Sequence, residues 1–195
     1  GLPIEPMVRV PRGDYTWLAR ALDIGARGVM IPMVESGDHA RSIMQACRYP
    51  PMGRRGAAFG FAQCDYLGGD VGEKIRQAHA RTMVIAQIET ERGLENVDDI
   101  AAVDGVDVLW VGHFDLSNFM GIPGQFDDPR FDAAMRKVVE ACRRHGKAAG
   151  FMATDSRWIE RAQKMGYPMI AAGTDSGLLQ QAFAGMIDRI EVRAP

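Results

Sequence analysis

The sequence has 195 residues, of which 47% are hydrophobic and 25% charged, a composition that is ordinary for a globular domain. With 23 basic and 25 acidic side chains the net charge is −2, so no overall field would attract nucleic acid or an anionic membrane surface. No apolar run approaches the ~20 residues of a membrane span, and the first residues lack the charged and apolar regions of a signal peptide.

Three cysteines, Cys47, Cys64 and Cys142, are odd in number and share no metal-ligand spacing. We interpret them as reduced thiols and therefore expect a cytoplasmic protein. A catalytic cysteine would need a basic partner nearby in the sequence, and none is evident.

Short apolar segments alternate with longer amphipathic segments along the chain. The predicted strands cover residues 7–10, 28–34, 82–89, 106–112, 147–153 and 167–175. The predicted helices cover residues 14–24, 37–48, 71–80, 91–102, 129–145, 155–165 and 176–192. This alternation is typical of an α/β fold, in which helices cover a parallel sheet.

Such a sheet is either open and doubly wound or closed into a (β/α)8 TIM barrel. A dinucleotide-binding sheet would carry a G-x-G-x-x-G turn after an early strand, whereas the Gly-rich stretch 53–60 follows a "YPP" loop. The predicted strands end in polar residues, at the edge where barrels build their sites: Arg9, Glu35, Glu89, Asp115, Thr154 or Asp155, and Asp175. At roughly 30 residues per β/α unit, the chain supplies about six units. We therefore expect residues 1–195 to form a single barrel domain that lacks its N-terminal portion.

Glu89 and Asp115 form the strongest candidate pair. The two-residue period of a strand places Gln87 and Glu89 on one face, and a carboxylate there is costly unless it is paired, hydrogen-bonded or bound to a metal. Consecutive parallel strands lie ~4.8 Å apart, so both carboxylates would lie at one rim, where Mg²⁺ or Mn²⁺ suits oxygen ligands. Two alternatives remain open: Asp115 as the N-cap of a helix over 115–119, and Glu89 as the solvated start of a helix.

Two further residues are candidates for the same rim. Arg9 ends the first predicted strand, and a guanidinium beside a metal can neutralise a keto or enolate oxygen; the alternative is a structural ion pair. His113 is either an acid or base or a packed histidine. The longest irregular stretch, 49–70, has a length typical of functional or disordered loops.

Three stretches, "RYPPMGRRG", "QIETERGLENVDDIAAVDGVDVLWVGHFDLS" and "GTDSGLL", resemble the HpcH/HpaI aldolase family. The resemblance extends over essentially the whole chain. It implies a barrel of the pyruvate/phosphoenolpyruvate type and a metal-dependent class II aldolase that cleaves a 4-hydroxy-2-oxo acid or a 2-keto-3-deoxy sugar acid, through a metal-stabilised enolate, to pyruvate and an aldehyde. It also implies a bound Mg²⁺, Mn²⁺ or Co²⁺, and a homo-oligomer such as a hexamer with active sites near subunit interfaces.

The resemblance also implies roles for individual residues. Glu89 and Asp115 correspond to the metal ligands, and Gln87 corresponds to a glutamine that lines the site. Arg9 matches an arginine that contacts the keto oxygen of pyruvate. The backbone N–H groups around Phe114 and Asp115 would hold the substrate carboxylate, in the way that a helix N-terminus binds anions.

Asp23, in "ALDIG", corresponds to an aspartate that reaches a neighbouring subunit's site and orients a catalytic histidine. From the sequence alone, a solvated residue near a helix end is the favoured interpretation of Asp23. Two differences from the family pattern affect these expectations. The family's catalytic histidine lies upstream of the segment that contains Arg9, and this sequence has no such segment. The usual "GPxDLS" reads "GHFDLS" here, with His113 in place of proline.

Two other functions remain as alternatives. A citrate-lyase-like or malyl-CoA-type lyase shares the barrel, the metal and the enolate chemistry, but it would require a surface that binds coenzyme A. A non-catalytic barrel that binds a metal or a keto acid would lack the catalytic base. We expect no nucleic acid or membrane partner for any of these functions.

Overall fold

The computed structural model describes residues 4–190, which contain one six-stranded parallel sheet. Its strands are β1 (Met7–Arg9), β2 (Gly28–Ile31), β3 (Met83–Ile88), β4 (Val108–Val111), β5 (Ala148–Ala153) and β6 (Met169–Ala172). The helices are α1 (Tyr15–Asp23), α2 (Gly37–Cys47), α3 (Val71–Arg81), α4 (Glu91–Glu95), α5 (Val97–Ala101), α6 (His113–Phe119), α7 (Pro129–Arg144), α8 (Ser156–Met165) and α9 (Asp175–Ile187), with a 3-10 turn η1 (Ala62–Cys64). The predicted alternation of strands and helices is confirmed.

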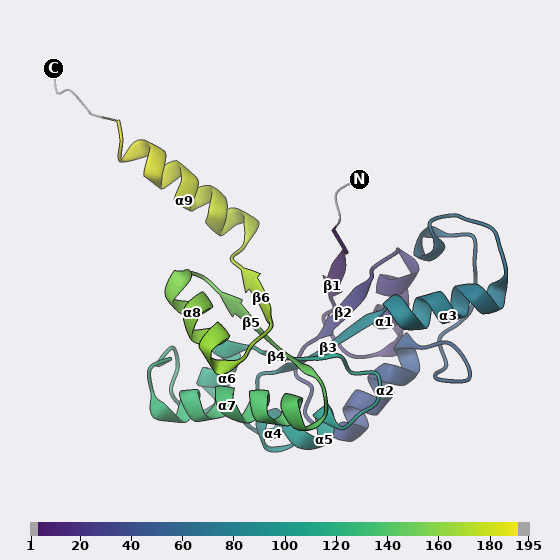
Figure 1. Cartoon of the computed structure of the whole chain (residues 1–195), viewed down its shortest axis with the longest axis horizontal. Helices are drawn as coiled ribbons and strands as arrows, with labels where there is room; N and C mark the ends of the chain where they lie inside the picture. The colour runs from purple at the N-terminus through teal and green to yellow at the C-terminus, as the bar shows by residue number, and fades with distance from the viewer. Residues whose placement is uncertain (1–3, 191–195) are drawn as a thin grey trace.

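The strands follow one another in space in the order in which they occur in the sequence, β1 to β6, and all are parallel. The sheet curls, with the helices along its convex side (Figure 1). Within residues 4–190, β1 and β6 each pair with one neighbour, so the sheet is a half-barrel with two open edges. The six strands agree with the six β/α units that the sequence predicts for a barrel domain that lacks its N-terminal portion, and the described residues form a half-barrel and not a complete (β/α)8 barrel.

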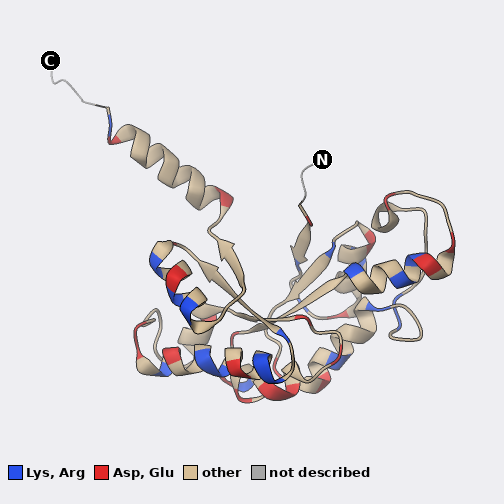
Figure 2. Ribbon diagram, viewed as in Figure 1, with Lys and Arg blue, Asp and Glu red and all other residues tan. Residues whose placement is uncertain are grey.

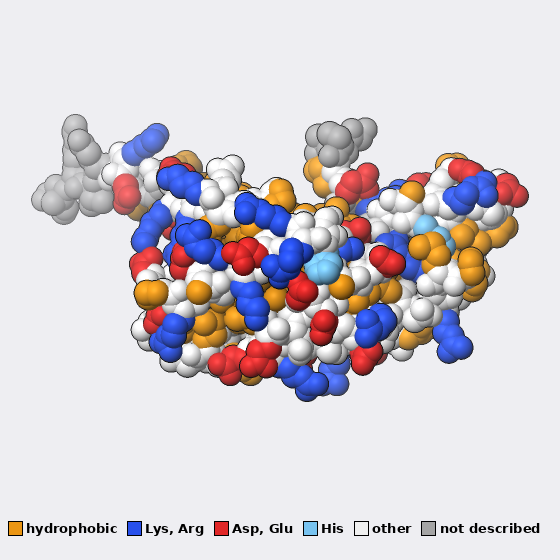
Figure 3. Space-filling view, turned by 60° about the horizontal axis from the view of Figure 1, so that its bottom comes forward, with side chains coloured by type: hydrophobic (Ala, Val, Ile, Leu, Met, Phe, Trp, Pro, Cys, Tyr) orange, Lys and Arg blue, Asp and Glu red, His pale blue; other side chains and the backbone are white. Residues whose placement is uncertain are grey.

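The main core lies between the convex face of the sheet and the helices. Alternate strand residues such as Val84 and Ile88 point outward and pack with Ile43, Ile100 and Val138 from α2, α5 and α7. The outer surfaces of these helices carry interspersed basic and acidic side chains (Figures 2 and 3). Because the two signs are mixed, these surfaces form no large patch of one charge within the described residues.

The concave face of the sheet carries a second, smaller apolar cluster. Ile85, Val108 and Trp110 are buried there, and partly buried methionines pack against them. Because side chains alternate along a strand, Gln87 follows Ile85 on this concave face, beside Trp110 of β4 in the register of the two strands. The strand ends thus present their polar residues to the inside of the curl.

Most helices begin at a polar side chain that accepts a hydrogen bond from the first turn. These N-caps are Asp14, Ser36, Asp70, Thr90, Asp128, Asp155 and Thr174. Thr90, Asp155 and Thr174 thus follow a strand and begin the next helix. Thr174, the last residue before α9, caps that helix.

Helix α9 extends away from the rest of the molecule (Figure 1). None of its residues is buried, and charged side chains occur only near its two ends (Figure 2). Its large apolar side chains are all exposed, so within the described residues this helix covers no part of the core, and residues 191 and 192 of the predicted helix lie outside them. None of the described helices has the length and apolar composition required to cross a membrane.

Candidate active site

Glu89 lies directly after β3, on the concave face, and only 2% of it is exposed. Its Oε1 accepts a hydrogen bond from the Met33 backbone N–H at 2.8 Å, and its Oε2 accepts one from Gln87 Nε2 at 2.6 Å. Gln87 and Glu89 thus share one face, as the strand period predicts. The hydrogen bonds fix both oxygens of a carboxylate that is otherwise removed from water.

Gly112, at the end of β4, makes this arrangement sterically possible. A Cβ atom built at residue 112 would lie 2.5 Å from Glu89 Oε2 and 2.7 Å from Gln87 Nε2. The Glu89 carboxylate therefore packs against bare backbone, and any side chain at residue 112 would displace it. The sequence analysis missed Gly112 because its contact depends on the pairing of two strands.

Met33 was also missed. It follows β2 with a φ of 51°, in the left-handed region that non-glycine residues seldom adopt. This conformation accompanies the hydrogen bond from its N–H to Glu89. The sequence carries no signal for it, because a methionine after a strand ordinarily continues an extended or turn backbone.

Asp115 lies in the first turn of α6, within hydrogen-bonding reach of Glu89. Burial raises the pKa of Glu89, and the neighbouring Asp115 carboxyl adds to the rise, whereas the Met33 N–H and the Arg9 guanidinium oppose it. The interpretation of Asp115 as an N-cap is wrong, because α6 begins two residues earlier and Gly112 occupies the cap position. Two carboxyl groups of like charge thus lie together at one rim.

These residues fit a divalent cation. Glu89 and Asp115 supply carboxylate oxygens, and the Oε1 atom of Gln87 is buried without a hydrogen-bond partner. Within residues 4–190 no group of three or more His, Cys, Asp or Glu side chains forms a metal cage. Two carboxylates that leave the remaining positions to water or substrate oxygens are typical of Mg²⁺.

A cavity of about 470 Å³ opens beside the carboxyl pair, inside the curl of the sheet. Its polar lining consists of Arg9, Gln87, His113 and Asp115, together with Gly112 backbone. Its apolar lining includes Phe114, Trp110, Met7, Met30, Ile85, Met152 and Met169. The structure therefore brings Arg9, Gln87, Phe114 and Asp115 to one cavity.

His113 begins α6 and is 8% exposed. Its ring lies among aromatic rings, with centroid distances of 4.5 Å to Phe114, 5.1 Å to Phe151 and 5.3 Å to Phe126. Burial lowers the pKa of His113, although Asp115 acts in the opposite direction. These contacts favour the packed histidine, which also forms part of the cavity wall.

Asp23 does not join this group. It ends α1 and forms an ion pair with Arg55, with 2.8 Å between Asp23 Oδ1 and Arg55 Nη2. Arg55 is 3% exposed and its guanidinium lies 4.7 Å from the centre of the Tyr49 ring. Within one chain Asp23 is therefore held by the 49–70 segment and does not line the cavity beside Glu89.

Comparison with known proteins shows the family of the chain. The family described as HpcH/HpaI aldolase/citrate lyase matches residues 1–182. The chain belongs to this family. It is 38% identical over 181 residues to a hydroxypyruvate/pyruvate aldolase of Roseobacter denitrificans, covering 90% of this chain and 68% of that protein. It is 35% identical to a 2-keto-3-deoxy-L-rhamnonate aldolase of Klebsiella pneumoniae, covering 91% of this chain and 66% of that protein.

A solved structure of an HpcH/HpaI aldolase from Desulfitobacterium hafniense superposes with a TM-score of 0.89 at 33% identity, covering 97% of this chain and 74% of that one. The half-barrel described here therefore matches about three quarters of that aldolase. As a member of the HpcH/HpaI family with aldolases among its relatives, the chain is an enzyme of the lyase class.

Proposed function

We propose that this HpcH/HpaI aldolase cleaves the C3–C4 bond of a 4-hydroxy-2-oxo acid or a 2-keto-3-deoxy sugar acid, releasing pyruvate and an aldehyde. The observation that carries the proposal is that the Glu89 carboxyl lies within hydrogen-bonding reach of Asp115, and that Asp115 lines one cavity together with Arg9. The names of the aldolases to which the chain is similar support the same reaction. These names favour aldol cleavage over a citrate-lyase-like activity. Among the described residues, no contact in the cavity supports the citrate-lyase-like activity.

Glu89 and Asp115 would hold the divalent cation, Mg²⁺, Mn²⁺ or Co²⁺. When bound, such a cation supplies Lewis-acid polarisation of the 2-keto oxygen. The donor chemistry supports this assignment, since both ligands are carboxylates and the unpartnered Oε1 of Gln87 adds an acceptor for a bound water. The same oxygen ligands accept all three ions, so the choice among them is left to metal analysis.

The remaining residues bind and orient the substrate. Arg9, at the cavity wall, neutralises negative charge that develops on the keto oxygen. The backbone N–H groups at Phe114 and Asp115 face the substrate carboxylate from the first turn of α6. Hydrogen bonds from Gln87 and Met33 hold Glu89 in place throughout.

We further propose that Asp23 acts in trans. The family resemblance assigns the proton acceptor to a histidine upstream of Arg9, and Asp23 would orient that histidine from a neighbouring subunit. The position of Asp23 away from its own cavity, held by Arg55, supports a role toward another chain. The active enzyme is accordingly a homo-oligomer with its sites near subunit interfaces.

The six strands would belong to one (β/α)8 barrel domain. The two open edges of the sheet support this, because an exposed edge presents unpaired N–H and C=O groups. The chain also matches only 74% of the length of the solved relative. The concave apolar cluster around Trp110 would then be covered by the remaining strands.

Deuterium exchange into the methyl group of pyruvate, followed by NMR, tests the function without knowledge of the aldehyde. We expect exchange with added Mn²⁺ or Mg²⁺, its loss with a chelator, and its loss in Glu89→Gln. Because exchange requires removal of a methyl proton, it reports enolate formation directly. No exchange by metal-loaded, full-length protein would contradict the pyruvate aldolase proposal.

A further inference from the structure

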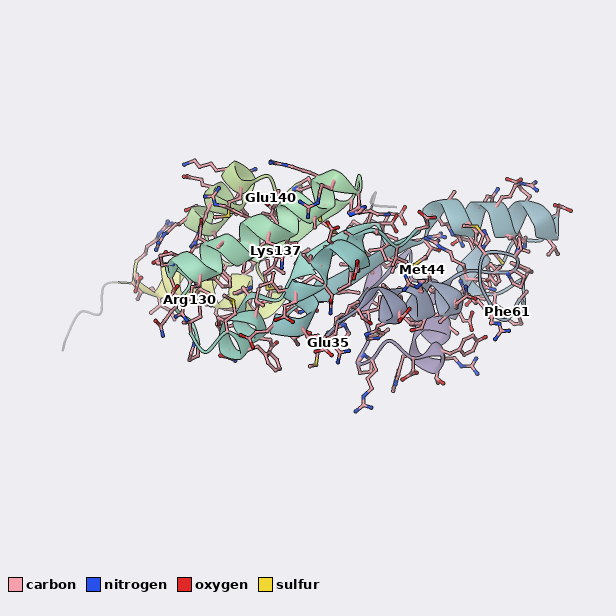
Figure 4. The ribbon with its side chains drawn as sticks, turned by 90° about the horizontal axis from the view of Figure 1, so that it is seen from below. Glu35, Met44, Phe61, Arg130, Lys137 and Glu140 are labelled. Carbon is pink, nitrogen blue, oxygen red and sulfur yellow. The ribbon has the colours of Figure 1, made fainter. Side chains whose placement is uncertain are left out.

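A second cavity, of about 260 Å³, lies between the 49–70 segment and α3. It shares no lining residue with the cavity beside Glu89. Phe61 marks this end of the molecule, next to α3 and far from Arg130 on α7 (Figure 4). Cys64 and Lys74 face each other across its wall, with 3.6 Å between Lys74 Nζ and Cys64 Sγ.

The backbone folds around the Cys64 sulfur. The Gly60 N–H donates to Sγ with a distance of 3.0 Å between the two heavy atoms. Lys74 also donates to the Leu67 carbonyl oxygen, which anchors its ammonium beside the sulfur. Burial opposes ionisation of Cys64, but the hydrogen bonds of the loop and the Lys74 ammonium outweigh it, so the pKa of this thiol is lowered.

The other two cysteines have the opposite environment. Cys47 and Cys142 are each 2% exposed. Burial raises the pKa of Cys47 to about 12 and that of Cys142 to about 11. Since the thiolate is the reactive form of cysteine, the chain carries one activated thiol and two inert thiols that serve as internal controls.

The cavity wall also contains polar groups that lack partners. Tyr49 is 1% exposed and Gln63 is 6% exposed, and both line the cavity. Among the described residues, neither the Tyr49 hydroxyl nor the Gln63 Oε1 has a hydrogen-bond partner. Buried polar groups are ordinarily hydrogen-bonded. The Tyr49 hydroxyl can donate and accept a hydrogen bond and Gln63 Oε1 can accept one, so the pair indicates a small polar molecule that can both donate and accept.

We propose that this cavity admits a small hydroperoxide, such as hydrogen peroxide, and that Cys64 is its oxidation site. The Cys64 thiolate attacks one peroxide oxygen: an S–O bond forms, the O–O bond breaks, and the other oxygen leaves as hydroxide, which takes up the proton that the thiol released on ionisation. Sulfur is oxidised by two electrons to the sulfenic acid, and the peroxide is reduced to water. The Lys74 ammonium and the Gly60 N–H stabilise the negative charge on sulfur. The proposal is independent of the aldolase chemistry.

The test is site mapping after exposure of the protein to hydrogen peroxide and dimedone, a reagent that traps sulfenic acids. We expect the adduct on Cys64, with labelling of Cys47 and Cys142 lower by about tenfold or more. Glu89→Gln should label to the same extent, because its substitution lies in the other cavity. No adduct on Cys64, or equal labelling of all three cysteines, would overturn the proposal.

Two variants separate activation of the thiol from recognition of the peroxide. In Lys74→Met, the pH midpoint of alkylation by iodoacetamide should rise and the peroxide reaction should slow, because the ammonium is lost. In Tyr49→Phe, the peroxide reaction should slow by about threefold or more while the alkylation midpoint stays unchanged, as expected for a lost hydrogen bond of about 0.7 kcal/mol. An unchanged peroxide rate in Tyr49→Phe would contradict binding in the cavity, and an unchanged midpoint in Lys74→Met would contradict the activation.

Discussion

At the scale of single residues, the site contains a carboxyl pair that lowers the stability of the fold. Glu89 is buried beside a second carboxyl, and only the N–H of Met33, the amide of Gln87 and the charge of Arg9 counteract the cost. Gly112 leaves the space in which this carboxylate sits. A buried carboxylate that lowers stability is common where function requires it.

Without divalent metal, Glu89→Gln should be more stable than the wild type at pH 8, because it removes a buried carboxylate whose charge burial disfavours. The folded-state pKa of Glu89 is raised; the penalty is therefore present above that pKa and disappears as pH falls below the ordinary pKa of glutamate. The variant amide can also pair with Gln87 if the latter turns its unpartnered Oε1 toward it. Thermal unfolding in chelator at pH 8 and pH 4 measures the difference. Added Mn²⁺ should stabilise only the wild type, and a less stable variant at pH 8 would contradict the prediction.

Gly112→Ala should abolish pyruvate exchange while the fold persists. The new Cβ would lie 2.5 Å from Glu89 Oε2, so the carboxylate must move, and a shift of ~1 Å at such a site costs about 100-fold in rate. Gly185→Ala is the matched control, because nothing lies within 4 Å of its added Cβ. Exchange rates and far-ultraviolet circular dichroism of the two variants provide the comparison. Retained activity in Gly112→Ala would show that Glu89 tolerates the displacement.

The sequence predicted Gln87, Glu89 and Asp115 because strand periodicity and strand order suffice to place them at one rim. It did not predict Gly112 or Met33, whose contacts depend on how neighbouring strands are aligned. At this scale, sequence patterns identified the charged groups, and only the structure identified the backbone that holds them.

At the scale of elements, the alternation of strands and helices was correct, and the bounds of most predicted helices agree with the structure within one or two residues. The predicted helix 91–102 divides at Asn96 into α4 and α5. Helix α6 begins at His113 and not at Asp115, because burial of the His113 ring among Phe114, Phe126 and Phe151 fixes an earlier start. Such aromatic contacts are tertiary and leave no periodic signal in seven residues.

Removal of an N-cap should affect stability differently in a helix that packs on the core and in a helix that does not. Thr90→Ala should lower the free energy of unfolding by about 1 kcal/mol, because Thr90 is buried and caps α4 through the Gly93 N–H at 3.0 Å. Thr174→Ala should change it little, although Thr174 caps α9 through the Gly177 N–H at 3.1 Å. Helix α9 has no buried residue, so its fraying costs the core nothing. Urea unfolding of both variants measures the contrast, and equal losses would contradict it.

At the scale of the whole molecule, the sequence indicated a curled parallel sheet but not how its surfaces are covered. Six strands in sequential order produce a concave face whose Trp110 cluster lines an open cavity. Helix α9 presents apolar side chains to solvent along its full length, including Leu179, Phe183 and Ile187 at four-residue spacing. A stripe of this kind is typical of a surface that another chain covers, in agreement with the proposed oligomer.

Charge on that stripe should therefore dissociate the proposed oligomer. We expect Leu179→Glu combined with Phe183→Glu to lower the mass measured by light scattering, because carboxylates replace apolar side chains that are 58% and 55% exposed in the single chain and would be buried between chains. Gln181→Glu is the matched control: it adds a negative charge on the opposite side of α9, two residues from either position, and should leave the mass unchanged. If Asp23 acts in trans, aldol cleavage should be lost in the dissociated variant. Exchange into pyruvate then shows whether enolate formation also requires the neighbouring subunit. An unchanged mass in the double variant would show that α9 does not mediate assembly.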